Sequence, residues 1–149
     1  MRCNLLKVRA IVDGRAKGEV LFSAQAIAFL QGVNPETGSV SDPKSPIYNQ
    51  SFAGKILIFP NTVGSSVGAY VIYRLKKNHR APRAIVNQKT DIITASGCAI
   101  AGIPLFDLPE NDISDLSEAR TVSLDSTLPR PKGRNYRGDL WSFFSPSER

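Results

Sequence analysis

Two adjacent serines follow a glycine at residues 64–66, directly before an apolar stretch from Val67 to Leu75 whose pattern predicts a helix. A short apolar run, Ile56 to Phe59, predicts a buried strand before them, and the next residue, Pro60, ends it. Free N–H groups and the positive dipole end at a helix N-terminus can bind a carboxylate or phosphate. The serines therefore either form a substrate-facing turn or simply cap the helix.

The chemistry that such a turn can support is proton removal from carbon. A general base needs a lone pair within hydrogen-bond reach of the proton, and a free serine is a very weak base. Its alkoxide becomes accessible only when positive charge, backbone N–H groups or a helix N-terminus stabilise it. The turn at Gly64 supplies the last two of these.

Five ordered segments stand out between Gly14 and Asp107. They are Gly18-Glu19-Val20 with Ser23, Gly32-Val33-Asn34-Pro35-Glu36-Thr37-Gly38, Gly54-Lys55-Ile56-Leu57-Ile58-Phe59-Pro60, Gly64-Ser65-Ser66-Val67-Gly68-Ala69-Tyr70-Val71 and Ala101-Gly102-Ile103-Pro104-Leu105. In these segments the chain resembles the small "swivel" subunit of the aconitase X family, whose members are heterodimeric hydro-lyases. Each segment alone is a weak signal, but together and in the family's order they are specific.

This resemblance implies a dehydratase that forms only with a second, large subunit, in a heterodimer or a dimer of heterodimers. By position, Ser65 corresponds to the family's catalytic base, while Gly64 and Ser66 correspond to substrate-binding residues. The family's iron–sulfur cluster is held by cysteines of the large subunit, so the resemblance implies that this chain holds no metal and is inactive alone. The substrate is then a small anionic hydroxy acid. Our first expectation is 5-phosphomevalonate, dehydrated to anhydromevalonate phosphate.

One departure from the family pattern keeps other functions open. Members commonly carry a basic residue and an extra glycine just before the serine turn, where this chain has Asn61-Thr62-Val63. A charge for the alkoxide or a phosphate would then come from Lys55, Arg15 or the large subunit. The alternatives are the small subunit of a cis-3-hydroxy-L-proline dehydratase and a swivel module with a binding or regulatory role only.

The pattern along the chain predicts an α/β fold. We expect the strand from Leu5 to Val12 to turn at Asp13-Gly14 into a second strand around Glu19 to Phe22, forming a hairpin. Strand and helix then alternate, which favours parallel strands. The result is a mixed sheet or a partly closed barrel with flanking helices, and the resemblance specifies a swivelling β/β/α domain. The later elements are expected at Lys55 to Phe59, a helix from about Ser65, Ala84 to Asn87, a helix at Ile92 to Ala101, and Ile103 to Phe106.

We divide the chain into a swivel domain, residues 1–107, and a C-terminal extension, residues 108–149, because the family pattern fades after Asp107. The extension holds one possible strand, Thr121 to Leu124, and three aromatic residues, which we expect to dock on this domain or on its partner. These are Trp141, Phe143 and Phe144. The long loop from Gly32 to Pro46 is either a wall of the site or an ordinary surface turn.

Composition limits the remaining classes. The net charge of +6 raises nucleic acid as a partner, but basic residues gather at the end of the helix that follows Ser65, where they complement its dipole, and no nucleic-acid motif accompanies them. No segment has the length and apolarity of a membrane span, and the first residues lack the apolar core of a signal peptide, so we expect a cytoplasmic protein. Cys3 and Cys98 have no partners at metal-ligand spacing and are interpreted as reduced structural thiols.

Overall fold

A computed structural model describes the backbone of residues 4–126 and 139–146, and the side chains of residues 6–126. Seven strands close into a barrel in the order β1, β7, β6, β5, β2, β8, β9. None of the described helices has the length and apolar character needed to span a membrane. The strands are β1 (Asn4–Val12), β2 (Arg15–Phe22), β5 (Ile56–Phe59), β6 (Ala84–Asn87), β7 (Leu105–Asp107), β8 (Ala119–Asp125) and β9 (Asp139–Pro146).

Four neighbouring strands of the barrel, β2, β5, β6 and β7, run parallel. The residue pairs Val20 with Ile56 and Ile56 with Ala84 fix their register. The other neighbouring pairs are antiparallel. The predicted α/β class with a mixed, barrel-like sheet is therefore confirmed.

The predicted hairpin between the first two strands is wrong. In the described barrel β1 pairs with β7 and β9, whereas β2 pairs with β5 and β8. The chain does reverse at Asp13-Gly14, but residue Ser126 at the end of β8 takes up the backbone groups of this turn: its Oγ accepts from the Gly14 N–H at 2.8 Å, and its N–H donates to the Gly14 carbonyl. The backbone groups of β1 and β2 therefore pair with strands that are distant in the sequence, and β1 and β2 do not pair with each other.

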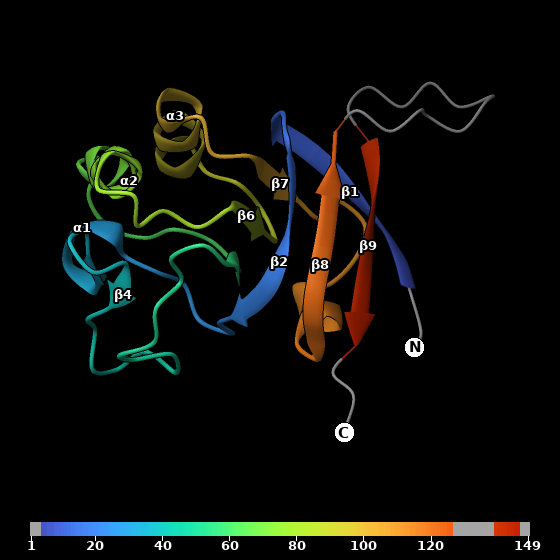
Figure 1. The fold of residues 1–149 in the computed structure, drawn as a ribbon, viewed down its shortest axis with the longest axis horizontal. Helices are drawn as coiled ribbons and strands as arrows, with labels where there is room; N and C mark the ends of the chain where they lie inside the picture. Colours follow the sequence, from blue (N-terminus) through green and yellow to red (C-terminus); the bar gives the residue numbers. More distant parts are fainter. Residues whose placement is uncertain (1–3, 127–138, 147–149) are drawn as a thin grey trace.

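Helices cover one side of the parallel strands (Figure 1). They are α1 (Phe29–Gly32), α2 (Gly68–Lys77) and α3 (Ile92–Ala101), and a small two-stranded sheet, β3 (Val33–Asn34) with β4 (Ser39–Val40), lies beside them. A 3-10 helix, η1 (Ile113–Leu116), precedes β8. The predicted bounds of β6 and α3 match the structure, whereas α2 begins at Gly68, later than the expected start near Ser65.

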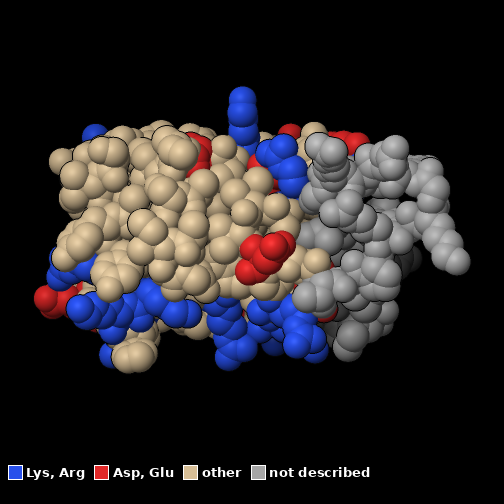
Figure 2. Space-filling view, turned by 90° about the horizontal axis from the view of Figure 1, so that it is seen from above, with Lys and Arg blue, Asp and Glu red and all other residues tan. Residues whose placement is uncertain are grey.

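Charged residues are unevenly spread over the helical side. Arg74, Lys76 and Lys77 lie in the last turn of α2, where they complement the negative end of its dipole as the sequence predicted. Figure 2 shows Lys and Arg residues along one edge of this view and a broad area without charge beside them, over α2 and α3. The basic residues of the described chain therefore border the helix layer rather than cover it.

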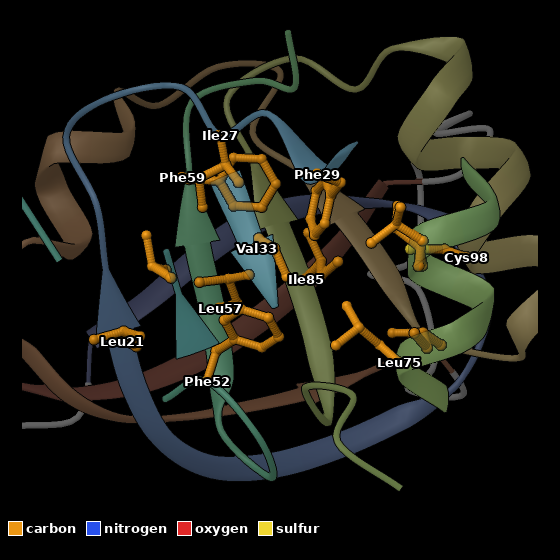
Figure 3. Close-up of a cluster of buried hydrophobic side chains, with 14 of the residues drawn as sticks. Leu21, Ile27, Phe29, Val33, Phe52, Leu57, Phe59, Leu75, Ile85 and Cys98 are labelled. Carbon is orange, nitrogen blue, oxygen red and sulfur yellow. The ribbon is translucent and has the colours of Figure 1, made fainter. Parts of the chain in front are cut away.

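Strand β5 is buried on both faces and separates two cores. Leu57 and Phe59 face the helices and pack in one cluster with Phe29, whose ring meets that of Phe59 edge-on at a centroid distance of 5.8 Å (Figure 3). Ile56 and Ile58 belong to a second cluster, which η1 closes with Ile113 and Leu116. Such two-sided burial explains the uninterrupted apolar run of this strand.

Helices α2 and α3 approach closely because glycine stands at their contact. A Cβ added to Gly97 would lie 3.0 Å from Ile72 Cδ1 and 3.1 Å from the Ala69 carbonyl oxygen. Gly68, at the start of α2, faces Ile93 and Phe29 in the same way, with Cβ distances of 3.4 and 3.5 Å. The position of α2, and with it the turn that precedes it, therefore depends on small residues at this crossing.

Residues beyond 107 contribute two strands to the barrel. β8 pairs with β2, and β9 pairs with both β8 and β1. The three aromatic residues of the tail, Trp141, Phe143 and Phe144, belong to β9 by their backbone, while their side chains lie outside the described part of the structure. The division of the chain at residue 107 stays a prediction. In the structure, strands from both sides of this boundary pair with each other: β8 with β2, and β9 with β1.

We expect Gly97→Ala to lower the free energy of unfolding by about 1–3 kcal/mol, because an added methyl group would overpack the α2–α3 contact. Alanine favours helix more than glycine does, so a propensity effect alone would have the opposite sign. Ser96→Ala, one residue away on the same helix, serves as the control. Urea unfolding measures both variants, and a Gly97→Ala protein as stable as the parent would contradict the prediction.

Candidate functional site

The three residues predicted to form the site, Gly64, Ser65 and Ser66, lie together on one exposed turn before α2. The Ser65 Oγ accepts a hydrogen bond from the Val67 N–H at 3.2 Å. Ser66 Oγ makes no hydrogen bond to any residue that the structure describes. Of the two hydroxyls, it is therefore Ser65 that is held by a backbone amide at the N-terminal end of the helix.

The first amides of α2 are already engaged. The N–H groups of Gly68, Ala69 and Tyr70 donate to the carbonyls of the residues three before them, beginning with Ser65. The sequence suggested that these amides would be free to bind an anion, but in the structure they are not. What the helix end offers at Ser65 Oγ is the Val67 N–H and the positive end of the dipole.

The chain enters the turn through a fixed backbone path. Ile27 N–H donates to the Asn61 carbonyl at 3.2 Å, and Val63 N–H donates to the Ile27 carbonyl at 3.0 Å. Gly64 then adopts φ of 99°, a conformation that side-chain-bearing residues rarely take. The position of Ser65 is therefore set by pairing on one side and by a glycine-dependent bend on the other.

Asp91 ties the same segment to α3. Its carboxylate accepts from the Thr94 N–H at 2.9 Å, which caps α3, and from the Thr62 N–H at 3.0 Å. The hydroxyls of Thr62 and Thr94 are also hydrogen-bonded to each other. Asp91 was not among the predicted site residues, although an Asp directly before a predicted helix is an N-cap signal. One carboxylate thus couples the start of α3 to the loop that carries Ser65.

Further polar groups gather at the carboxyl ends of β6 and β7. Asp107, only 1% exposed, accepts two hydrogen bonds from the Arg9 guanidinium, at 3.0 and 2.6 Å. Asn87 Nδ2 donates to the Phe59 carbonyl, while Asn87 Oδ1 and Thr90 Oγ1 are buried without a hydrogen-bond partner in the described chain. Buried polar atoms cost free energy when they lack a partner, so these two groups do not stabilise the fold through hydrogen bonds within the described chain.

An open pocket of about 470 Å³ lies at this end of the sheet. Its only basic lining residue is Lys89; the others are Pro60, Asn61, Thr62, Gln88, Thr90 and Asp91. Lys55 and Arg15, which the sequence offered as sources of positive charge, lie elsewhere. Lys55 precedes β5 and bonds to Arg83 through the backbone, and Arg15 lines a second open pocket with Arg83 and Lys76. Of Lys55, Arg15 and Lys89, it is Lys89 that lies beside the loop that leads to Ser65.

The turn at residues 34–38 contacts residues at the opposite end of α2 from the serine turn. Pro35 O accepts from Asn78 Nδ2 at 2.9 Å, and a Cβ on Gly38 would lie 2.7 Å from the Arg80 carbonyl oxygen. Both contacts are with residues that follow the carboxyl end of α2, whereas Ser65 precedes its amino end. This part of the long loop is therefore a structural turn at the far end of the helix.

The described side chains do not suit a metal cluster. They contain no group of three or more His, Cys, Asp or Glu residues placed to hold a metal ion. Burial, together with the nearby Asp91 charge, raises the pKa of the Cys98 thiol to about 12, so this thiol stays protonated at neutral pH. Cys3 lies outside the described residues. Cys98 therefore behaves as a small core residue, as the sequence predicted.

A barrel with four parallel strands, covered by helices on one side and bearing a glycine-serine turn at a helix N-terminus, defines a swivel-type domain. Residues 5–129 match the aconitase X swivel domain, and the chain belongs to this family. The match continues past residue 107 and includes β8.

Curated relatives and a solved structure agree with this assignment. The phosphomevalonate dehydratase small subunit of Thermococcus kodakarensis is 50% identical over 121 residues, which cover 81% of this chain and 90% of the relative. The protein of the same name from Methanocella arvoryzae is 44% identical over 123 residues, covering 82% and 93%. The crystal structure of Thermococcus kodakaraensis aconitase X in its holo-form superimposes with a TM-score of 0.74 at 47% identity, covering 82% of this chain and 92% of that one.

We expect Asp91→Ala to lower the free energy of unfolding by about 2 kcal/mol, since it removes a helix cap and the acceptor for Thr62 N–H. It should also speed hydrogen exchange at the Thr62 amide. Asp112→Ala is a matched control, because Asp112 caps η1 through the Ser114 N–H but does not contact the serine loop. If Asp91→Ala left Thr62 exchange unchanged, Asp91 would not anchor this loop.

Proposed function

We propose that this chain is the small subunit of a heteromeric phosphomevalonate dehydratase and that Ser65 is the base of the reaction. One observation carries the proposal. The chain belongs to the aconitase X swivel family, and the hydroxyl of Ser65, which the resemblance assigns to the family's catalytic serine, accepts the Val67 N–H just before α2. A serine in this position has the stabilisation that a free serine lacks.

In the proposed step, the Ser65 alkoxide takes a proton from a substrate carbon. The electrons of that C–H bond form the new double bond as the hydroxyl on the neighbouring carbon leaves, and Ser65 later releases its proton, so that water is the second product. The Val67 N–H and the dipole of α2 lower the cost of the alkoxide before the transfer. Gly64 leaves room for the substrate beside Ser65, and Ser66 offers its hydroxyl as a hydrogen-bond partner.

Departure of the hydroxyl needs help that the described side chains do not provide. They offer no ligand set for a metal, and the buried Cys98 thiol is protonated. We therefore assign the iron–sulfur cluster to the large subunit, where it would supply Lewis-acid chemistry. The reacting centre would then lie where the two subunits meet.

The substrate is inferred from the relatives, whose names specify phosphomevalonate dehydratase at up to 50% identity. The chain supports recognition of an anion in one respect: Lys89 lines the pocket beside the serine loop. We assign to Lys89 the charge that the family commonly carries just before the turn, and the large subunit would supply further charge. A screen that includes cis-3-hydroxy-L-proline separates this proposal from the other dehydratase of the family.

In the reconstituted complex, Ser65→Ala should lower kcat at least about 100-fold, the lower end of what a positioned general base contributes. Ser66→Ala should act mainly on KM, because its hydroxyl is assigned to substrate binding and holds no part of the turn. Steady-state rates with 5-phosphomevalonate, followed by NMR detection of the unsaturated product, measure both.

Ser117→Ala, which alters an exposed serine beside η1, is the control for these variants. If Ser65→Ala kept normal turnover while Ser66→Ala abolished it, the base would be Ser66. If neither change mattered in an active complex, this chain would contribute no base and would be a binding or regulatory module.

The purified chain alone should not dehydrate 5-phosphomevalonate, because it supplies the base without a Lewis acid for the leaving hydroxyl. Addition of the large subunit with its cluster should restore turnover, and the large subunit alone should be inactive. The same product assay tests all three samples. Turnover by the single chain would refute the two-subunit proposal.

A further inference from the structure

We infer that the outer face of α2 and α3 is the surface on which the large subunit docks; this inference rests on the proposed function. We call it the helix face and define it by the exposed apolar side chains on α2, on α3 and on the loop before α2: Val63, Val67, Tyr70, Tyr73, Ile92 and Ile100.

These side chains are unusually open to solvent for their type. Ile92 is 79% exposed, Ile100 is 71% exposed and Tyr70 is 60% exposed. The rings of Tyr70 and Tyr73 lie 6.3 Å apart, so the two form one aromatic surface on α2. Exposed apolar side chains that gather on one face mark interaction sites in soluble proteins, and tyrosines are frequent anchors there.

The sequence of α3 points the same way. Its ten residues, Ile92–Ala101, contain no charged residue, although only one side of the helix packs on α2 and the core. Its exposed positions, Ile92, Ala99 and Ile100, are all apolar, and a helix without a polar outer face is buried in its functional setting. Figure 2 shows the result as a broad uncharged area over α2 and α3, with Lys and Arg along one edge. We therefore expect α3 to be covered in the functional assembly.

The identity of the occupant follows from Ser65. The loop that carries it supplies Val63 and Val67 to the helix face, so any protein docked there lies beside the proposed base. In the proposed reaction a Lewis acid acts beside the base, and the large subunit is the component assigned to bring one. A second copy of this chain would place two such loops together without providing that group. The basic residues at the end of α2 predict acidic residues on the facing edge of the partner.

The test uses the full chain and the cluster-loaded large subunit. Ile92→Glu and Ile100→Glu, alone and combined, place charge at the two most exposed positions, where the fold itself is little affected. We expect the double variant to raise the dissociation constant of the complex at least about 100-fold, as changes at the anchor residues of an interface do. Tyr48→Glu is the matched control, since Tyr48 is exposed but lies outside the helix face, and it should change affinity less than about threefold.

Thermal melting of each variant alone verifies the fold, and hydrogen exchange gives an independent readout: the large subunit should slow exchange in α3 more than in β8. Unchanged affinity of the double variant, or protection confined to β8, would overturn the docking surface even if the complex is an active dehydratase. A persistent dimer of this chain through α3 inside the complex would also overturn it. Conversely, tight binding that the double variant abolishes, in a complex without dehydratase activity, would retain the docking surface and refute the proposed function.

Discussion

The burial of β5 on both faces is the constraint on which the rest of this structure depends. Four consecutive apolar residues, Ile56–Phe59, leave no face for water, so the strand requires a helix layer on one side and a filled barrel on the other. The same burial fixes where the chain emerges. Pro60 and Asn61 follow directly, and the serine turn can begin only at the carboxyl end of the parallel strands. Stability and the position of the candidate base thus have one origin.

A second level of order comes from polar contacts at that end of the sheet. Asp91 holds both the first turn of α3 and the Thr62 amide, while Arg9 on β1 reaches Asp107 at the end of β7. The ends of three parallel strands are therefore connected to one helix and to one antiparallel strand. This arrangement lets an exposed turn have a defined position, because its supports belong to rigid elements rather than to the loop itself.

Sequence patterns predicted most elements of the parallel half, because a strand buried on both faces leaves a continuous apolar run and α3 has clear limits at Asp91 and Gly102. They failed at the first turn: Asp13-Gly14 has the local signal of a hairpin, but pairing with β7, β9, β5 and β8 depends on residues far away in the chain. The serine turn was found by its residue types and family order. Its surroundings were not, since Asp91 reaches the Thr62 amide and Lys89 joins the pocket beside this loop only through the fold. The later start of α2, which leaves the first amides engaged, also depends on backbone geometry that composition does not reveal.

The closure of the barrel by β1 and β9 has a consequence for the order in which the molecule forms. Asn4 pairs with Phe144, so the first described strand gains its second neighbour only after nearly the whole chain has been synthesised. The backbone pairing of the parallel strands, by contrast, lies within residues 15–107, although η1 and β8 complete the core on the second face of β5. The partners of the parallel pairs are therefore synthesised before β9, whereas contacts between distant segments form late because of their entropy cost. Until then, one edge of β1 offers unpaired backbone groups, which makes this edge the vulnerable part of the nascent chain.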